Sequence, residues 1–181
     1  DNGQVIQFHP NTTYENFVGG LAPVHTEEGL GLQFKPKPGF LMEAAAAAAK
    51  NPNAPYLLLI DEINRADLAK VLGEAIFLLE PFETGRTLNL AYEYDKPHGS
   101  TLKLPPNLHI LGTMNSSDRS IAIVDIAVRR RFAFLKLWPQ ISVVKTYGHE
   151  LMLEAFQGLL DIFVEYADDE ALELLPGHSY F

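Results

Sequence analysis

The sequence predicts an α/β fold built on a parallel sheet, and two apolar runs carry this prediction. Residues 57–60 are four apolar side chains without a polar interruption, a pattern typical of a strand buried on both faces of a parallel sheet. Residues 108–113 (LHILGT) form a second run of the same kind. Helical patterns at 39–50 and 66–79 lie before and after the first run.

The first 38 residues predict one short strand, a helical turn and a loop. The strand covers 5–8 (VIQF) and is broken at Pro10, because Pro restricts the residue before it. Residues 14–18 suit one or two helical turns, which two glycines end. Residues 21–38 are rich in Gly and Pro, which indicates a loop containing a short hairpin.

Two helices and a hairpin are predicted in the middle of the chain. Residues 39–50 (GFLMEAAAAAAK) contain six consecutive Ala, the residue with the best helix propensity. At 66–79 the apolar positions recur at spacings of three and four, as in an amphipathic helix. Residues 87–104 alternate on both sides of a turn, which predicts a β-hairpin that projects from the core.

The last third of the chain predicts a change from α/β to helical structure. Residues 121–128 suit a helix that ends at three arginines, and 132–137 (FAFLKL) suit a further strand. From residue 142 onward an apolar stripe indicates helix, about four turns long. We therefore place an α/β core at 1–139 and the start of a helical domain at 140–181.

The composition excludes several classes of function. The chain has 14 basic and 23 acidic residues, so 14 − 23 = −9, which argues against a general nucleic-acid surface but not against a local basic patch. It has no Cys, which excludes disulfides, thiolate nucleophiles and Cys-ligated zinc. No apolar run approaches the roughly 18 residues of a membrane span. The chain begins without Met, which suggests a fragment or a processed protein.

Asp61 and Glu62 directly follow the first apolar run. Open α/β sheets bind ligands at the carboxyl ends of their strands, and two adjacent carboxylates repel each other unless a cation is present. One interpretation is a Walker B element, in which Asp61 holds Mg²⁺ through water and Glu62 polarises the attacking water. The other is an ordinary helix start, since acidic residues favour helix N-termini. These residues alone do not separate the two.

Three adjacent arginines, Arg129 to Arg131, follow the predicted helix at 121–128. Cations in a last helical turn stabilise the helix dipole, which is the structural explanation. Adjacent arginines also repel one another, and the Arg fork binds phosphate oxygens in pairs. An anionic partner is therefore the functional explanation.

Four blocks of the sequence occur together and in a fixed order. They are VIQFHPNTTYENFVGG, LLLIDEINRADLAKVLGEAIFLLE, NLHILGTMNSSDRSIAIVDIAVRRRFAF and the terminal GHSYF. The combination of DEINRA, MNSSDRS and RRRF resembles the AAA+ domain of McrB-type GTPases, the motor subunit of modification-dependent restriction systems. MoxR-like and dynein-related AAA+ modules share these elements in looser form.

The resemblance implies roles for two carboxylates and two amides. It makes Asp61 the Walker B acid associated with Mg²⁺, and Glu62 the catalytic carboxylate. Asn64 and Asn115 are implied to position the attacking water, with Asn115 in the sensor 1 position. Asp61, Glu62 and Asn115 are the implied contacts to Mg²⁺ and to GTP or ATP, and no residue here reads the base.

The resemblance also implies residues that act between subunits. Asp118 and Arg119 complete the signature and couple the site to its neighbour. Arg130 and Arg131 are implied to be the arginine-finger pair that reaches the site of the adjacent subunit. A finger supplied in trans implies a ring of identical subunits, hexameric in the parent protein.

One departure from the family pattern is the absence of GxxxxGK[ST] from these 181 residues. The resemblance thus implies a three-layer P-loop NTPase core that is incomplete, lacking its first strand and P-loop, with the start of a helical lid. The strands at 108–113 and 132–137 would flank the missing strand. Because buried unpaired backbone groups cost roughly 1–3 kcal/mol each, we expect another segment or copy to fill the slot, or the two strands to close up.

The implied function is a cytoplasmic nucleoside triphosphatase that drives a McrC-like nuclease subunit on DNA, without membrane contact. Contacts to DNA would come from regions absent here. Two alternatives stay open: a non-catalytic assembly module that only offers arginine fingers, and a MoxR-like chaperone ATPase. We expect the 181 residues alone to be inactive, since a triphosphate loses its main contacts without a P-loop.

Overall fold

The computed structural model describes residues 2–25, 32–80, 83, 85–115, 124–168, 171 and 174–181. Its contacts divide the chain into two compact units. The first comprises Asp1–Asn115 with Ser120–Ala133, and the second contains Phe134–Phe181. The first unit holds a sheet with its helices, and the second is helical.

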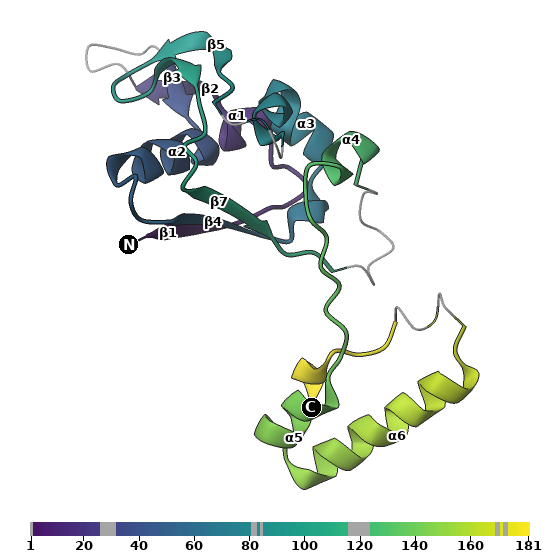
Figure 1. The fold of residues 1–181 in the computed structure, drawn as a ribbon. Helices are drawn as coiled ribbons and strands as arrows, with labels where there is room; N and C mark the ends of the chain where they lie inside the picture. Colours follow the sequence, from purple (N-terminus) through teal and green to yellow (C-terminus); the bar gives the residue numbers. More distant parts are fainter. Residues whose placement is uncertain are drawn as a thin grey trace. The chain divides into compact units, whose positions relative to one another are not determined.

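A parallel sheet of three strands forms the centre of the first unit (Figure 1). Its strands are β1 (Gly3–Gln7), β4 (Tyr56–Asp61) and β7 (Leu108–Gly112), in the order β1-β4-β7. Val5 lies opposite Leu59, which in turn lies opposite Leu111. The predicted α/β class and all three of these strands are confirmed.

Helices cover one face of this sheet (Figure 1). They are α1 (Tyr14–Phe17), α2 (Phe40–Lys50), α3 (Leu68–Leu72) and the 3₁₀ helix η2 (Gly73–Leu79). Ala44, Ala45 and Ala48 are buried on α2, and their small side chains let the helix lie close to β4. Leu58 and Ile60 of β4 are 0% and 2% exposed in the resulting core.

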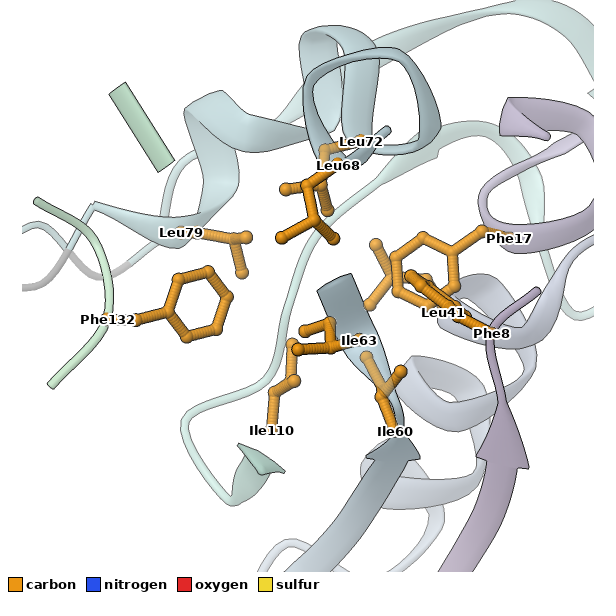
Figure 2. A pocket seen from close by; sticks show the side chains of 10 residues that line it. All are labelled: Phe8, Phe17, Leu41, Ile60, Ile63, Leu68, Leu72, Leu79, Ile110 and Phe132. Carbon is orange, nitrogen blue, oxygen red and sulfur yellow. The ribbon is translucent and has the colours of Figure 1, made fainter. Parts of the chain in front are cut away.

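A cavity of about 10 Å³ remains between these layers (Figure 2). Its lining is entirely apolar and consists of Phe8, Phe17, Leu41, Ile60, Ile63, Leu68, Leu72, Leu79, Ile110 and Phe132. The volume is about that of one water-sized probe, and the lining offers a water no polar side chain. This cavity is therefore a packing gap in the core and not a ligand site.

The opposite face of the sheet is open within the described residues. Val5 is 71% exposed, Leu57 40% and Leu111 52%. Parallel sheets are ordinarily covered on both faces, so the structure is an incomplete version of the predicted three-layer core.

Residues 132–137 do not form the predicted strand. They have no regular secondary structure, and Leu135 and Leu137 are 85% and 87% exposed. Within the described residues, β7 pairs with β4 alone, so its second edge offers no strand on which 132–137 could form a ladder. The strand predicted at 132–137 is therefore wrong, and with it the alternative in which it closes up on β7. The other alternative, in which another segment or copy fills the slot, stays a prediction.

The segment predicted as one helix at 66–79 forms two pieces. Asp67 caps α3, and its Oδ1 accepts the Lys70 N–H at 3.2 Å. The helix ends at Gly73, whose φ of 48° is left-handed and where a Cβ would lie 2.9 Å from the Tyr14 ring. The chain continues as η2. The apolar spacing predicted helical structure correctly but did not report this interruption.

Two antiparallel hairpins complete the first unit together with a short helix. The hairpins are β2 (Gly19–His25) with β3 (Leu32–Pro38), and β5 (Leu88–Tyr94) with β6 (Gly99–Leu102). The second confirms the hairpin predicted at 87–104, and the first is longer than expected. The short helix α4 (Ile126–Arg129) begins at Asp125, whose Oδ1 accepts the Ala127 N–H at 2.6 Å.

The second unit consists of helices. They are α5 (Ile141–Tyr147), α6 (Glu150–Tyr166) and the 3₁₀ turn η3 (His178–Tyr180). Phe156 of α6 is fully buried, with its ring centroid 5.0 Å from that of Phe181. The predicted long helix is confirmed as α6. No helix of the described residues is long and apolar enough to cross a membrane.

Candidate functional site

Asp61 lies at the carboxyl end of β4, between side chains from the two neighbouring strands. Its Oδ2 accepts a hydrogen bond from Gln7 Nε2 at 3.2 Å, and its Oδ1 accepts one from Thr113 Oγ1 at 2.5 Å. Gln7 ends β1, and Thr113 directly follows β7. The parallel register brings the three strand ends to one edge of the sheet, so all three strands hold this carboxylate.

Glu62 has a backbone conformation that is uncommon for a residue with a side chain. Its φ and ψ are 51° and 46°, in the left-handed region. Its N–H donates to Thr113 Oγ1 at 3.1 Å, and its carboxylate pairs with Arg65. A strained backbone of this kind persists where its surroundings fix it and is concentrated at functional sites. Here one hydroxyl, that of Thr113, contacts both acidic residues.

Asn64, two residues after Glu62 in the sequence, is buried at 4% exposure. Its Nδ2 donates to the backbone carbonyl of Asn115 at 3.3 Å. Its Oδ1 is buried and has no hydrogen-bond partner within the described residues. The structure thus brings the two predicted amide residues together, and it leaves one acceptor suited to a water molecule.

The three arginines differ in their surroundings. Arg129 and Arg130 are exposed, whereas the Arg131 side chain is 8% exposed and pairs with Glu80 at 3.0 Å. Within the described residues, no hydrogen bond or ion pair joins Arg130 or Arg131 to Asp61, Glu62 or Asn64 of the same chain. Asp118 and Arg119, the other predicted site residues, lie outside the described residues.

Sequence reasoning missed Gln7, Thr113 and Arg65. The signal that could have found the first two is position, because each stands where a strand parallel to β4 ends. Arg65 lies three residues after Glu62, close enough for a local ion pair.

The residues around Asp61 fit a magnesium ion bound through water. Mg²⁺ prefers oxygen ligands and keeps several of its waters. Asp61 is partly exposed, and each carboxylate oxygen accepts one hydrogen bond, which leaves a lone pair on each for a hydrated cation. Together with the free acceptor on Asn64, this arrangement can hold a hydrated metal ion and orient a water.

Comparisons with known proteins find a matching domain family and two curated relatives. Residues 1–132 match the AAA domain of the dynein-related subfamily. The chain is 38% identical over 188 residues to the type IV methyl-directed restriction enzyme EcoKMcrB subunit of Escherichia coli K12, covering 98% of this chain and 40% of that protein. It is 28% identical over 163 residues to the type II restriction enzyme BsuMI component YdiS of Bacillus subtilis 168, covering 71% of this chain and 46% of that protein.

Among solved structures, a putative ATPase from Cytophaga hutchinsonii aligns over 80% of this chain and 36% of its own, with a TM-score of 0.47 and 18% identity. The chain spans less than half the length of both curated relatives that it matches.

Proposed function

Because the chain belongs to the dynein-related subfamily of AAA domains, we propose that the protein containing it is a McrB-type nucleoside triphosphatase. The resemblance found in the motifs is confirmed by this match and by the 38% identity to the Escherichia coli McrB subunit. The observation that carries the proposed activity is the Asp61–Glu62 pair, held at one sheet edge by Gln7 and Thr113.

In this proposal each residue of the site has a separate role in hydrolysis. Asp61 holds Mg²⁺ through water, and Glu62 polarises the water that attacks the γ-phosphate of GTP or ATP. Asn64 Oδ1 accepts a hydrogen bond from that water, and Asn115 assists from the adjoining strand end. Bound Mg²⁺ would neutralise charge on the phosphate oxygens.

The positive charge of the arginine segment acts on a neighbouring subunit in the same proposal. An arginine supplied in trans stabilises charge on the transferring phosphoryl group and contributes about 10³–10⁵ in rate. This arrangement requires a closed assembly such as a hexameric ring. Asp118 and Arg119 would couple one site to the next.

The names of the relatives suggest the process that hydrolysis serves. Both are components of restriction enzymes. We therefore propose that the full-length protein drives a partner nuclease in DNA restriction in the cytoplasm, with DNA bound by regions other than these 181 residues.

Glu62→Gln in the full-length protein tests the catalytic assignment. Removing a general base lowers turnover by about 10²–10⁴-fold, while nucleotide binding should stay near that of the parent protein. Turnover is measured with GTP and with ATP, beside Glu83→Gln as a control, since Glu83 is an exposed carboxylate in a surface ion pair. Survival of turnover in Glu62→Gln would show that the assignment is wrong.

A further inference from the structure

We propose that Glu80 is a positioning residue that locks Arg131 inside its own subunit, so that Arg130 is the arginine offered to the neighbour. This inference rests on the proposed function, in which the arginine segment acts in trans. Of the predicted finger pair, Arg130 then acts on the neighbouring subunit, and Arg131 holds the arginine segment within its own subunit.

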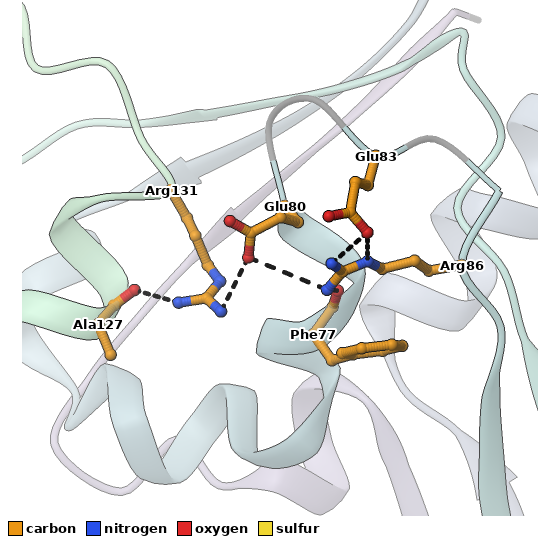
Figure 3. A network of polar contacts seen from close by, with 6 residues as sticks. All are labelled: Phe77, Glu80, Glu83, Arg86, Ala127 and Arg131. Carbon is orange, nitrogen blue, oxygen red and sulfur yellow. Dashed lines mark hydrogen bonds and ion pairs between the residues drawn. The ribbon is translucent and has the colours of Figure 1, made fainter.

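Two of the three guanidinium nitrogens of Arg131 have partners within its own chain (Figure 3). Its Nη2 lies 3.0 Å from Glu80 Oε2, and its Nη1 donates to the Ala127 carbonyl at 2.6 Å. Its Nε is buried without a hydrogen-bond partner among the described residues, and the whole side chain is 8% exposed. To reach a phosphate on another subunit, Arg131 would have to break both contacts and leave Glu80 behind.

Glu80 is itself held from a second side (Figure 3). Arg86 Nη1 lies 3.9 Å from the same Oε2 atom and donates to the Phe77 carbonyl at 3.1 Å. Arg86 is fixed further by Glu83, whose Oε2 accepts a hydrogen bond from Arg86 Nε at 2.9 Å. The Arg86 Cζ atom also lies 4.3 Å from the centroid of the Phe77 ring. The Glu80 carboxylate therefore has a fixed position between two guanidinium groups.

The Arg130 side chain, unlike that of Arg131, is exposed and not held by the residues that the structure describes. Arg130 caps the end of α4, where its N–H donates to the Ile126 carbonyl at 3.2 Å. Its side chain makes no hydrogen bond or ion pair with the described part of the chain. Arg130 lies between α4 and Arg131, so the contact of the Arg131 side chain with the Ala127 carbonyl also restricts the backbone that carries Arg130.

Substitution of Glu80 should free the Arg131 side chain from its position. Within the described part of the chain, Glu80 is the carboxylate partner of Arg131. A buried guanidinium that loses such a partner is strongly destabilised, so Arg131 and the end of α4 should move. A displacement of about 1 Å in a group that acts on a reaction can lower its rate by about 100-fold.

The test is a mixing experiment with full-length subunits. The acceptor carries Arg130→Ala and keeps its own Asp61 and Glu62. The donor carries Asp61→Ala, so that turnover in the mixture comes from acceptor sites beside a donor. A second substitution is then added to the donor: Arg130→Ala, Glu80→Gln, Arg131→Ala, or Glu93→Gln as the matched control, since Glu93 is exposed on β5 and lies outside the contacts of Glu80.

If the proposal holds, the Arg130→Ala donor loses about 10³-fold in rescue. The Glu80→Gln and Arg131→Ala donors each lose about 10–100-fold, and combining these two substitutions lowers rescue no further. The Glu93→Gln donor rescues like the parent donor. Full rescue by a Glu80→Gln donor, beside no rescue by Arg131→Ala, would make Arg131 the finger and overturn the proposal. Full rescue by the Arg130→Ala donor would instead overturn the proposed action in trans.

A second donor variant separates positioning from folding. Glu80→Leu with Arg131→Met replaces the ion pair with apolar side chains of similar size, a change that buried ion pairs often tolerate. Thermal melting should show this double variant to be more stable than Glu80→Gln, and its rescue should exceed that of the Arg131→Ala donor. A stable double variant with no rescue would show that the Arg131 guanidinium is itself needed, which also overturns the proposal.

Discussion

Successive side chains of β4 face two different environments. Leu58 and Ile60 lie under the helices at 0% and 2% exposure, whereas Leu57 on the other face is 40% exposed. Because side chains alternate along a strand, Asp61 shares the open face with Leu57 and Leu59. The covered face therefore carries the packing that stabilises the unit, and the carboxyl end of the open face carries the proposed chemistry.

Leu58→Ala should have the largest effect on stability, because it removes packing between β4 and the helices on the covered face. Removing a fully buried Leu costs roughly 2–5 kcal/mol, because the lost contacts leave a cavity. Denaturant unfolding of the 181-residue chain measures this loss. A loss below about 1 kcal/mol would show that the helices do not pack on β4 as described.

Thr113→Val should chiefly affect catalysis. The substitution keeps the shape of the side chain and removes the hydroxyl that contacts Asp61 and the Glu62 N–H. Groups that orient metal-binding residues contribute about 10–100-fold to activity, so turnover of the full-length protein should fall by that factor. Thr113→Ser keeps the hydroxyl and should retain most of the activity; equal turnover of the two variants would remove Thr113 from the site.

Asp67→Ala should weaken the start of α3 on the covered face. Loss of an N-cap side chain costs about 0.5–2 kcal/mol. The contact with Lys70 lowers the pKa of Asp67 below its ordinary value, so its stabilisation is present above the unfolded-state pKa and is lost as the pH falls through the folded-state pKa. Unfolding free energies at pH 7 and at pH values below that folded-state pKa should therefore converge for the parent chain and the variant. Asp67→Asn, which keeps a capping oxygen, is the control.

Val5→Thr on the open face should have the smallest effect. Val5 is 71% exposed, and substitutions at such positions usually change stability by less than about 0.5 kcal/mol. The change in unfolding free energy caused by Val5→Thr is also measured in the full-length protein. A larger loss there than in the 181-residue chain would show that other residues of the protein cover this face.

Most of the fold could be predicted because its signals are local. The three strands of the sheet, the Ala-rich helix α2 and the hairpin at 88–102 each have a clear pattern of their own. The strand predicted at 132–137 failed because a strand also needs a partner, which no local pattern supplies. The break at Gly73 was missed because apolar spacing continues across it.

The site was predictable in its residues but not in their support. Asp61, Glu62, Asn64 and Asn115 follow from motifs. The structure places the first three at the end of β4 and in the 3₁₀ turn that follows it, with Asn64 hydrogen-bonded to the Asn115 carbonyl. Their catalytic roles stay predictions, as do those of Asp118 and Arg119. Gln7 and Thr113 become neighbours of Asp61 only through the register of the sheet.

The arginines show the same limit of sequence reasoning. Three adjacent arginines look equivalent in sequence, and only the tertiary structure distinguishes the buried Arg131 from the exposed Arg130. The partner that makes the difference, Glu80, lies about 50 residues earlier in the chain, directly after the helix predicted at 66–79.

The Thr113 hydroxyl carries a single proton, which gives its two contacts a direction. The proton is donated to Asp61, and the oxygen is then free to accept the Glu62 N–H. The two contacts share one hydroxyl, so a movement of the Asp61 carboxylate that takes the Thr113 side chain with it also changes the hydrogen bond of the Glu62 N–H.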